Sequence, residues 1–343
     1  MLRPTDQPLE VLVDPNQPLD FGRLGVSVGI VAIVAASLIF VFGSLAGPPS
    51  SWLRPKWVHP PPAWFGFLIA AAFFGCEVVV GATTAGIVST GWYASGVAEE
   101  DRMLSTLAAR TIITPLFIIV LTFVRVRVIG PTPVPSLRRV AGWIALGAAA
   151  WFVLHPATTG VHLLTLLVKQ ELGGPIDSHP LAKLPPTRDG FGGALFGLAV
   201  CAMTPWVEEY FFRGLLIPWT LRGRYRPFAL LMLALMFPLL AFGDWRDPHY
   251  AALLFAGVLG VVLFACQCLP KGYPKRTILT VVSSSALFAA AHSAVWPSPI
   301  PLFVFALGLG YLTARTGSIV PGVVVHGLFN GASFVYLLRG PMP

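Results

Sequence analysis

Long apolar stretches, separated by short linkers rich in proline and charge, are the feature of this sequence that most restricts its fold. Several of them reach the ~20 residues that an α-helix needs to cross ~30 Å of hydrocarbon. A backbone in lipid must satisfy its own hydrogen bonds, as a helix does. We therefore predict an all-α fold, a polytopic transmembrane bundle of about eight to ten spans. The candidate spans are roughly 24–46, 65–90, 111–126, 140–168, 190–219, 228–242, 249–268, 277–295, 300–314 and 318–338.

The composition favours a membrane protein over several other classes. Of the 343 residues, 55% are hydrophobic and only 11% are charged, whereas soluble domains carry about 25% charged residues. The net charge of +8 fits the excess of Lys and Arg in cytoplasmic loops, and no nucleic-acid motif accompanies it. The four cysteines lie in apolar segments without the spacing of a zinc site or a disulfide framework. We expect an integral, multi-pass protein of the cytoplasmic membrane of a bacterium, in contact with the lipid bilayer and with no nucleic acid.

One apolar span carries a group of charges in its middle. The sequence TPWVEEYFFRG (204–214) places Glu208, Glu209 and Arg213 inside the run from Phe191 to Trp219. Each charge near the middle of a bilayer costs roughly 2.5–3.5 kcal/mol on translocon-insertion scales, so such groups pair with one another or face a polar cavity. Glu209 and Arg213 are four residues apart and can form an ion pair, whereas Glu208 points about 100° away. One carboxylate is expected to be held by the arginine, and the other to be available for chemistry.

Two further spans contain polar side chains at membrane depth. His292 ends the sequence FAAAH, and His326 and Asn330 begin and end HGLFN, so that the last two share one helical face. A glutamate, two histidines and an asparagine suffice for a hydrolytic site. The carboxylate can take a proton from water with the help of one histidine, while the other histidine and the amide donate to a developing oxyanion. The alternative is a structural ion-pair cluster with histidines in interhelical hydrogen bonds.

The fourth candidate span holds two more histidines. His155 and His162 are seven residues apart on one helical face, and Pro156 between them could kink the helix. We interpret both histidines as interhelical hydrogen-bonding groups.

Three patterns follow one another along three apolar helices: EExxxR, FxxxH and HxxxN. Their types and their order resemble the motifs of the CPBP family. This family comprises CAAX prenyl proteases and bacteriocin-processing enzymes and is also called the Abi family. Pro205–Gly214 is similar to its first motif, with the preceding proline and the following glycine, and Gly310–Ser318 is similar to the segment before its last motif. The resemblance covers roughly 190–338. Compact family members join the first two motifs by a short turn, whereas an extra helix pair is expected here near 228–268.

The resemblance implies an intramembrane endopeptidase of the CAAX protease type, a hydrolase acting on membrane-associated peptides or proteins. Carried over by position, Glu208 would activate water, with His292 beside it. His326 and Asn330 would stabilise the oxyanion, and the ion-paired glutamate and arginine would support the site. Glu208, His292 and His326 would also fit a metalloprotease-like zinc site. No HExxH motif is present, and a glutamate-dependent hydrolase needs no metal, so no cofactor is firmly implied and zinc stays an alternative.

These interpretations divide the chain into three regions: a polar tail (1–23), an N-terminal membrane region of about four spans (24–189) and a CPBP-like catalytic domain (190–338). Two other functions stay open. A non-catalytic membrane scaffold or immunity protein would be expected to lack a motif residue, and an ion- or proton-coupled transporter would be expected to show inverted repeats. All motif residues are present and no repeat is found. The sequence gives no oligomeric state.

Overall fold

The computed structural model of the protein describes residues 79, 82–83, 113–123, 126, 135–171, 194, 197–221, 226–241, 275–292 and 298–339. Regular structure in these residues is helical, with no strand, so the all-α class is confirmed for this part of the chain. The predicted spans 24–46 and 249–268, and nearly all of 65–90, lie outside the described residues.

The other predicted spans coincide with helices to within a few residues where they are described, and for the span 190–219 the continuous described helix begins at residue 197. A helix over Ile113–Phe123 is followed by α4 (Leu137–Glu171), and one continuous helical segment is then built from η3 (Ala199–Met203), α6 (Thr204–Glu209), η4 (Tyr210–Leu216) and α7 (Ile217–Thr220). The remaining helices are α8 (Arg226–Ala241), α10 (Lys275–Ala290), α11 (Pro299–Thr316) and α12 (Val320–Arg339). The elements η3 and η4 are π-helices, which the sequence analysis did not predict.

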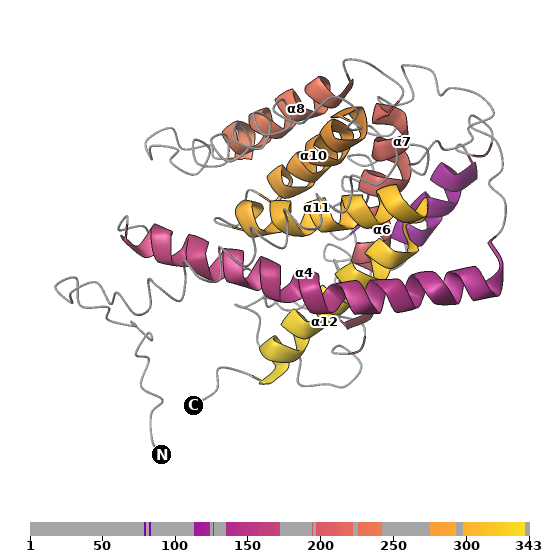
Figure 1. Cartoon of the computed structure of the whole chain (residues 1–343), viewed down its shortest axis with the longest axis horizontal. Coiled ribbons are helices and arrows are strands. Elements are labelled where there is room, and N and C mark those ends of the chain that lie inside the picture. The colour runs from indigo at the N-terminus through magenta and orange to yellow at the C-terminus, as the bar shows by residue number, and fades with distance from the viewer. Residues whose placement is uncertain are drawn as a thin grey trace.

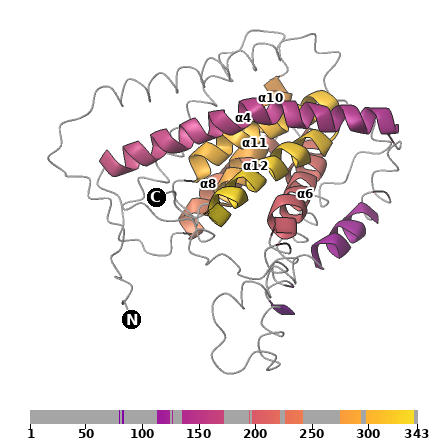
Figure 2. The same cartoon turned by 90° about the horizontal axis from the view of Figure 1, so that it is seen from below.

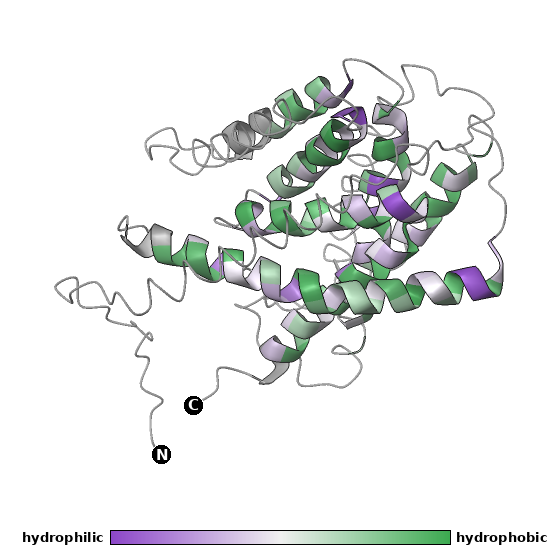
Figure 3. Cartoon of the chain, in the orientation of Figure 1, coloured by the Kyte–Doolittle hydropathy of each residue, from purple (hydrophilic) through white to green (hydrophobic). Residues whose placement is uncertain are grey.

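Apolar residues dominate these helices (Figure 3). By length and composition alone, Leu137–Leu167 and Pro299–Thr316 are apolar enough to cross a membrane, and the apolar helices Ile113–Phe123 and Val320–Tyr336 are shorter. The described residues therefore contain two helices that meet the criteria for a span, and the larger number predicted from sequence is not established by them.

The helices form a stack in which α10 lies between α8 and α11 (Figure 1). The long helix α4 crosses α11 and α12 (Figure 2). Glycines permit this close crossing: a Cβ atom at Gly147 would lie 2.7 Å from the carbonyl oxygen of Pro321, a backbone atom that cannot swing aside. Helices that cross in lipid commonly use small residues in this way.

The core of the stack surrounds α10. Its residues from Thr280 to Ala290 are all buried, and the buried side chains of η4, α8 and α11 pack against it. Phe212 and Phe288 meet edge to face, with ring centroids 5.1 Å apart. At the end of α11, Gly317 adopts a left-handed conformation (φ 69°) that closes the helix and suits glycine because it lacks a Cβ atom. The turn leads directly into α12, which carries His326.

Candidate active site

The two glutamates occupy the end of α6, a short α-helical segment with a π-helix on each side. Short π-helical segments are rare and are frequent at functional sites. Pro205 contributes to the irregularity before α6, because it has no N–H with which to bond a carbonyl of the preceding turn. In a π-helix that carbonyl is the one five residues earlier, on Val200.

Asn330 of α12 supplies the missing donor. Its side-chain Nδ2 donates to the carbonyl oxygen of Val200 at 2.9 Å. The two helices approach closely here, since a Cβ atom at Gly327 would lie 2.6 Å from the carbonyl oxygen of Cys201. Asn330 therefore links α12 to the start of the segment that carries the glutamates.

Glu209 and Arg213 form the ion pair that their spacing predicts. Arg213 Nη1 donates to Glu209 Oε1 at 2.9 Å, and both side chains are fully buried. A second nitrogen, Nη2, donates to the carbonyl oxygen of Ala306 at 3.4 Å, and the guanidinium lies 4.5 Å from the centre of the Phe288 ring. Such cation–π contacts are strengthened by desolvation. Arg213 thus ties α11 and α10 to the carboxylate of Glu209.

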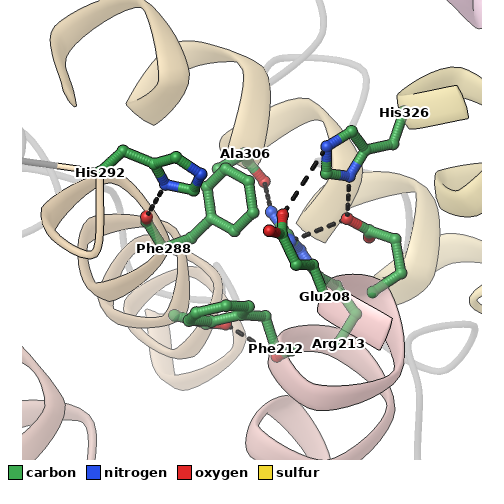
Figure 4. A network of polar contacts seen from close by, with 9 residues as sticks. Glu208, Phe212, Arg213, Phe288, His292, Ala306 and His326 are labelled. Carbon is green, nitrogen blue, oxygen red and sulfur yellow. Dashed lines mark hydrogen bonds and ion pairs between the residues drawn. The ribbon is translucent and has the colours of Figure 1, made fainter. Parts of the chain in front are cut away.

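His326 contacts both glutamates (Figure 4). Its Nδ1 lies 3.1 Å from Glu209 Oε1. Because that carboxylate already accepts a bond from Arg213, the histidine is the donor in this pair. Its other nitrogen, Nε2, lies 3.7 Å from Glu208 Oε2, which is too far for a direct hydrogen bond. Glu209 therefore fixes the orientation of the ring and directs Nε2 toward Glu208.

Glu208 differs from its neighbour in exposure. Its side chain is 18% exposed and that of Glu209 is 0% exposed. Glu209 Oε1 accepts two hydrogen bonds, whereas Oε2 of Glu209 and Oε2 of Glu208 are both buried without a hydrogen-bond partner among the described residues. Glu209 is held by Arg213, as the helical spacing predicts, and Glu208 is the more exposed of the two carboxylates.

His292 lies just beyond the end of α10, half-buried. Its Nδ1 bonds to the carbonyl oxygen of Phe288 at 2.8 Å, so Nδ1 carries the proton and Nε2 is left as an acceptor. The Phe288 ring packs beside His292 and His326, with centroid distances of 4.9 and 5.8 Å. Figure 4 shows this ring between the two histidines.

The six predicted residues thus have three placements. Glu209 bonds to both Arg213 and His326, and Glu208 lies 3.7 Å from the other nitrogen of His326. His292 approaches this group across the Phe288 ring, and Asn330, one helical turn beyond His326, bonds to Val200. Within the described part of the chain, no three His, Cys, Asp or Glu side chains are grouped so that they could hold a metal ion. Zinc binding by Glu208, His292 and His326 stays a prediction for experiment.

Two supporting residues were not identified from the sequence. A Cβ atom at Gly322 would lie 2.8 Å from Glu209 Oε2, so only glycine leaves the carboxylate in place. Ser284 of α10 donates from Oγ to the carbonyl oxygen of Phe212 at 2.9 Å, within the π-helix η4. The sequence shows that α12 contains glycines and that α10 contains hydroxyl side chains among apolar ones. It does not show that Gly322 meets Glu209 or that Ser284 meets Phe212, because these contacts depend on the packing of distant helices.

Comparison with known proteins gives one family. The model of the type II CAAX prenyl endopeptidase Rce1-like family matches residues 190–272 and 264–332. The matched stretches are similar to the Rce1-like family over residues 190–332. This is the family predicted from the motifs, and all six candidate residues lie in the matched stretches. No curated protein and no solved structure matches the chain.

The Rce1-like match concerns the part of the chain that carries the candidate site. That family is one of membrane-bound endopeptidases, and the match therefore supports a membrane protein and a hydrolase at family level. The helix α4 lies before the matched stretches, although it packs on α11 and α12 within them.

Proposed function

We propose that this protein is an intramembrane endopeptidase that hydrolyses peptide bonds with a water molecule activated by Glu208. The observation that carries the proposal is the asymmetry of the adjacent glutamates: Glu209 is buried and bonded to Arg213 and His326, whereas Glu208 is partly exposed and faces Nε2 of the same histidine. A carboxylate that acts as a general base must reach water, and a carboxylate that positions a histidine must not move.

The proposed reaction begins with water bound at Glu208. The carboxylate takes a proton as the water oxygen attacks the scissile carbonyl carbon, and His292, whose Nε2 is free to accept, assists. The carbonyl oxygen becomes an oxyanion. The carbon–nitrogen bond then breaks, and the proton held by Glu208 passes to the leaving amine.

His326 is proposed to stabilise the oxyanion. The bond between Nδ1 and the carboxylate of Glu209 fixes the ring, so that an Nε2–H group would be directed at the oxyanion. Preorganised donors of this kind contribute about 2.7–4 kcal/mol each to transition-state stabilisation. The second N–H of the Asn330 amide is available for the same purpose while the first bonds to Val200.

The proposed substrate is a membrane-associated peptide or protein, since the site lies among apolar helices and the family name refers to prenylated C-terminal sequences. No step of the proposed reaction uses a metal ion. Zinc dependence is treated as an experimental question.

The test is peptidase activity of the purified full-length protein in proteoliposomes. Wild type, Glu208→Gln and His292→Ala would be assayed against a quenched-fluorescence peptide library of plain and C-terminally lipidated peptides, with and without a chelator. We expect cleavage by wild type, its loss in Glu208→Gln and no effect of the chelator. Folded wild-type protein that cleaves no peptide would favour a non-catalytic scaffold or immunity role, and chelator-sensitive cleavage restored by zinc would overturn the metal-free mechanism.

A further inference from the structure

The helix α4 presents a stripe of polar side chains toward α12. Trp151, His155 and Thr158 follow one another at intervals of four and three residues, so they lie on one helical face. The Trp151 and His155 rings are stacked, with centroids 5.0 Å apart and planes at 16°. The His155 ring in turn meets Phe329 of α12 edge to face at 5.4 Å. We call these three residues the α4 stripe.

The α4 stripe has polar atoms that are buried but unsatisfied. Trp151 Nε1, His155 Nδ1 and Thr158 Oγ1 are all inaccessible to solvent and have no hydrogen-bond partner among the described residues. Leaving a buried donor or acceptor unpaired costs about 1–3 kcal/mol. Three such atoms lie on one face of a helix that is otherwise largely exposed, and they point to a ligand that pairs with them in another state of the protein. They also weaken the contact between α4 and α12, which favours its opening.

The α4 stripe lies close to the candidate active site. Two aromatic rings connect them: Phe329 contacts Phe305 of α11 with centroids 4.5 Å apart, and Phe305 contacts His326 at 5.4 Å. A substrate peptide that extends from the α4 stripe to His326 would therefore pass only the rings of Phe329 and Phe305. An extended peptide advances roughly 3.3 Å per residue, so a few residues of substrate suffice to span the interval.

We propose that the α4 stripe is a substrate-binding subsite that receives the unwound backbone of a membrane-embedded substrate as α4 parts from α12. This inference rests on the proposed peptidase function. A transmembrane helix must unwind before its peptide bonds can reach a catalytic group, and each carbonyl released by unwinding needs a donor, because the hydrocarbon supplies none. The indole N–H, the threonine hydroxyl and a histidine N–H are three such donors in a row.

The chemistry of the α4 stripe favours peptide carbonyls over other ligands. The indole nitrogen only donates, so a cation does not fit. The described residues of the stripe bear no fixed positive charge, so a phosphate has no counter-charge. A carbonyl accepts one or two hydrogen bonds and is uncharged, which matches neutral donors spaced along a helix.

The first test separates substrate binding from chemistry. Trp151→Phe keeps an aromatic ring beside His155 but removes the N–H together with part of the indole, and Thr158→Val keeps the shape and replaces only the hydroxyl. For the quenched-fluorescence peptide that wild type cleaves fastest, each change is expected to raise KM about two- to tenfold, the value of one hydrogen bond, with kcat within about twofold. Thr159→Val, which removes an exposed hydroxyl next to Thr158, is the matched control and should leave KM unchanged. A KM unchanged in both stripe variants would overturn the subsite.

A second test does not depend on hydrolysis. Glu208→Gln protein in proteoliposomes would be irradiated with synthetic transmembrane peptides of Leu and Ala carrying photo-leucine, either with a central Gly-Pro helix break or uninterrupted. The broken peptide is expected to label α4 around residues 151–158, and labelling should fall when Trp151→Phe and Thr158→Val are combined. Equal labelling by both peptides, or labelling unaffected by the two substitutions, would refute the subsite. Specific labelling by a protein whose wild type cleaves nothing would retain the subsite and refute the peptidase proposal.

Discussion

His326 Nδ1 lies 3.1 Å from Oε1 of Glu209, and this bond joins two helices whose residues are far apart in the sequence. The same carboxylate oxygen accepts from Arg213 at 2.9 Å. A fully buried carboxylate with two donors on one oxygen is held on two sides, so it can orient the imidazole without itself entering the reaction. The adjacent Glu208 lies 3.7 Å from Nε2 of the same histidine, and its Oε2 accepts no hydrogen bond from the described residues.

Glu208→Gln is expected to abolish hydrolysis without destabilising the protein. The amide keeps the size of the side chain but cannot take a proton from water, and general-base catalysis contributes about 10²–10⁴ in rate. Because the Glu208 carboxylate makes no strong contact in the folded protein, Tm in detergent should stay within a few degrees of wild type. The measurement is kcat together with the thermal unfolding profile. A Glu208→Gln variant that keeps its kcat would exclude the proposed base.

Glu209→Gln is expected to destabilise the protein strongly. It leaves Arg213 buried without a counter-charge, and breaking one partner of a buried ion pair costs about 3–5 kcal/mol. A clear fall in Tm should therefore accompany the loss of activity. The control is the double variant Glu209→Gln with Arg213→Met, which removes both charges and should recover part of the Tm but not the activity. Equal Tm values for the single and double variants would contradict a buried ion pair.

Gly322→Ala is expected to lower activity through Glu209. The added Cβ would lie 2.8 Å from Oε2, so the carboxylate must shift, and the histidine that it orients shifts with it. We expect a loss of about 10- to 100-fold in kcat, since small misplacements of catalytic groups are costly. Gly331→Ala on the same helix is the matched control: its Cβ would lie 3.9 Å from the Cys201 Sγ atom, an ordinary contact. Similar kcat values for the two variants would remove Glu209 from the positioning of His326.

Asn330→Ala separates two roles of one amide. Loss of the bond to Val200 alone should lower stability by about 0.5–1.5 kcal/mol, visible as a small fall in Tm. If the amide also donates to the oxyanion, kcat falls in addition by about 100-fold or more, while KM changes little. A fall in Tm with kcat unchanged would show that Asn330 acts only as a link between helices.

Several features of this site were predictable from sequence because they depend on local spacing. The helix boundaries follow from the lengths of the apolar runs, and the Glu209–Arg213 pair follows from a separation of four residues. The pair is present although the helix is π-type from Tyr210 to Leu216. The π-helical segments themselves leave no periodic signal in a run that is apolar on all sides.

Other features depend on packing between distant segments. The bond from Asn330 to Val200 joins residues 130 positions apart, and it compensates for an N–H that proline lacks. We interpreted His155 as an interhelical hydrogen-bonding group, but its Nδ1 has no such partner among the described residues and its ring stacks on Trp151 instead. Aromatic contacts of this kind cannot be read from spacing alone.

Because η4 is a π-helix, the site depends on the number of residues between Tyr210 and Leu216 as well as on their identity. A π-turn holds an additional residue relative to an α-turn, so deleting one residue between Tyr210 and Leu216 would allow an ordinary α-helix to form there. The segments before and after the deletion would then rotate relative to each other by roughly 100°. With α7 anchored in the core, Glu208 and Glu209 would turn away from α12. A single-residue deletion in η4 is therefore expected to be more harmful than any one substitution in the same turn.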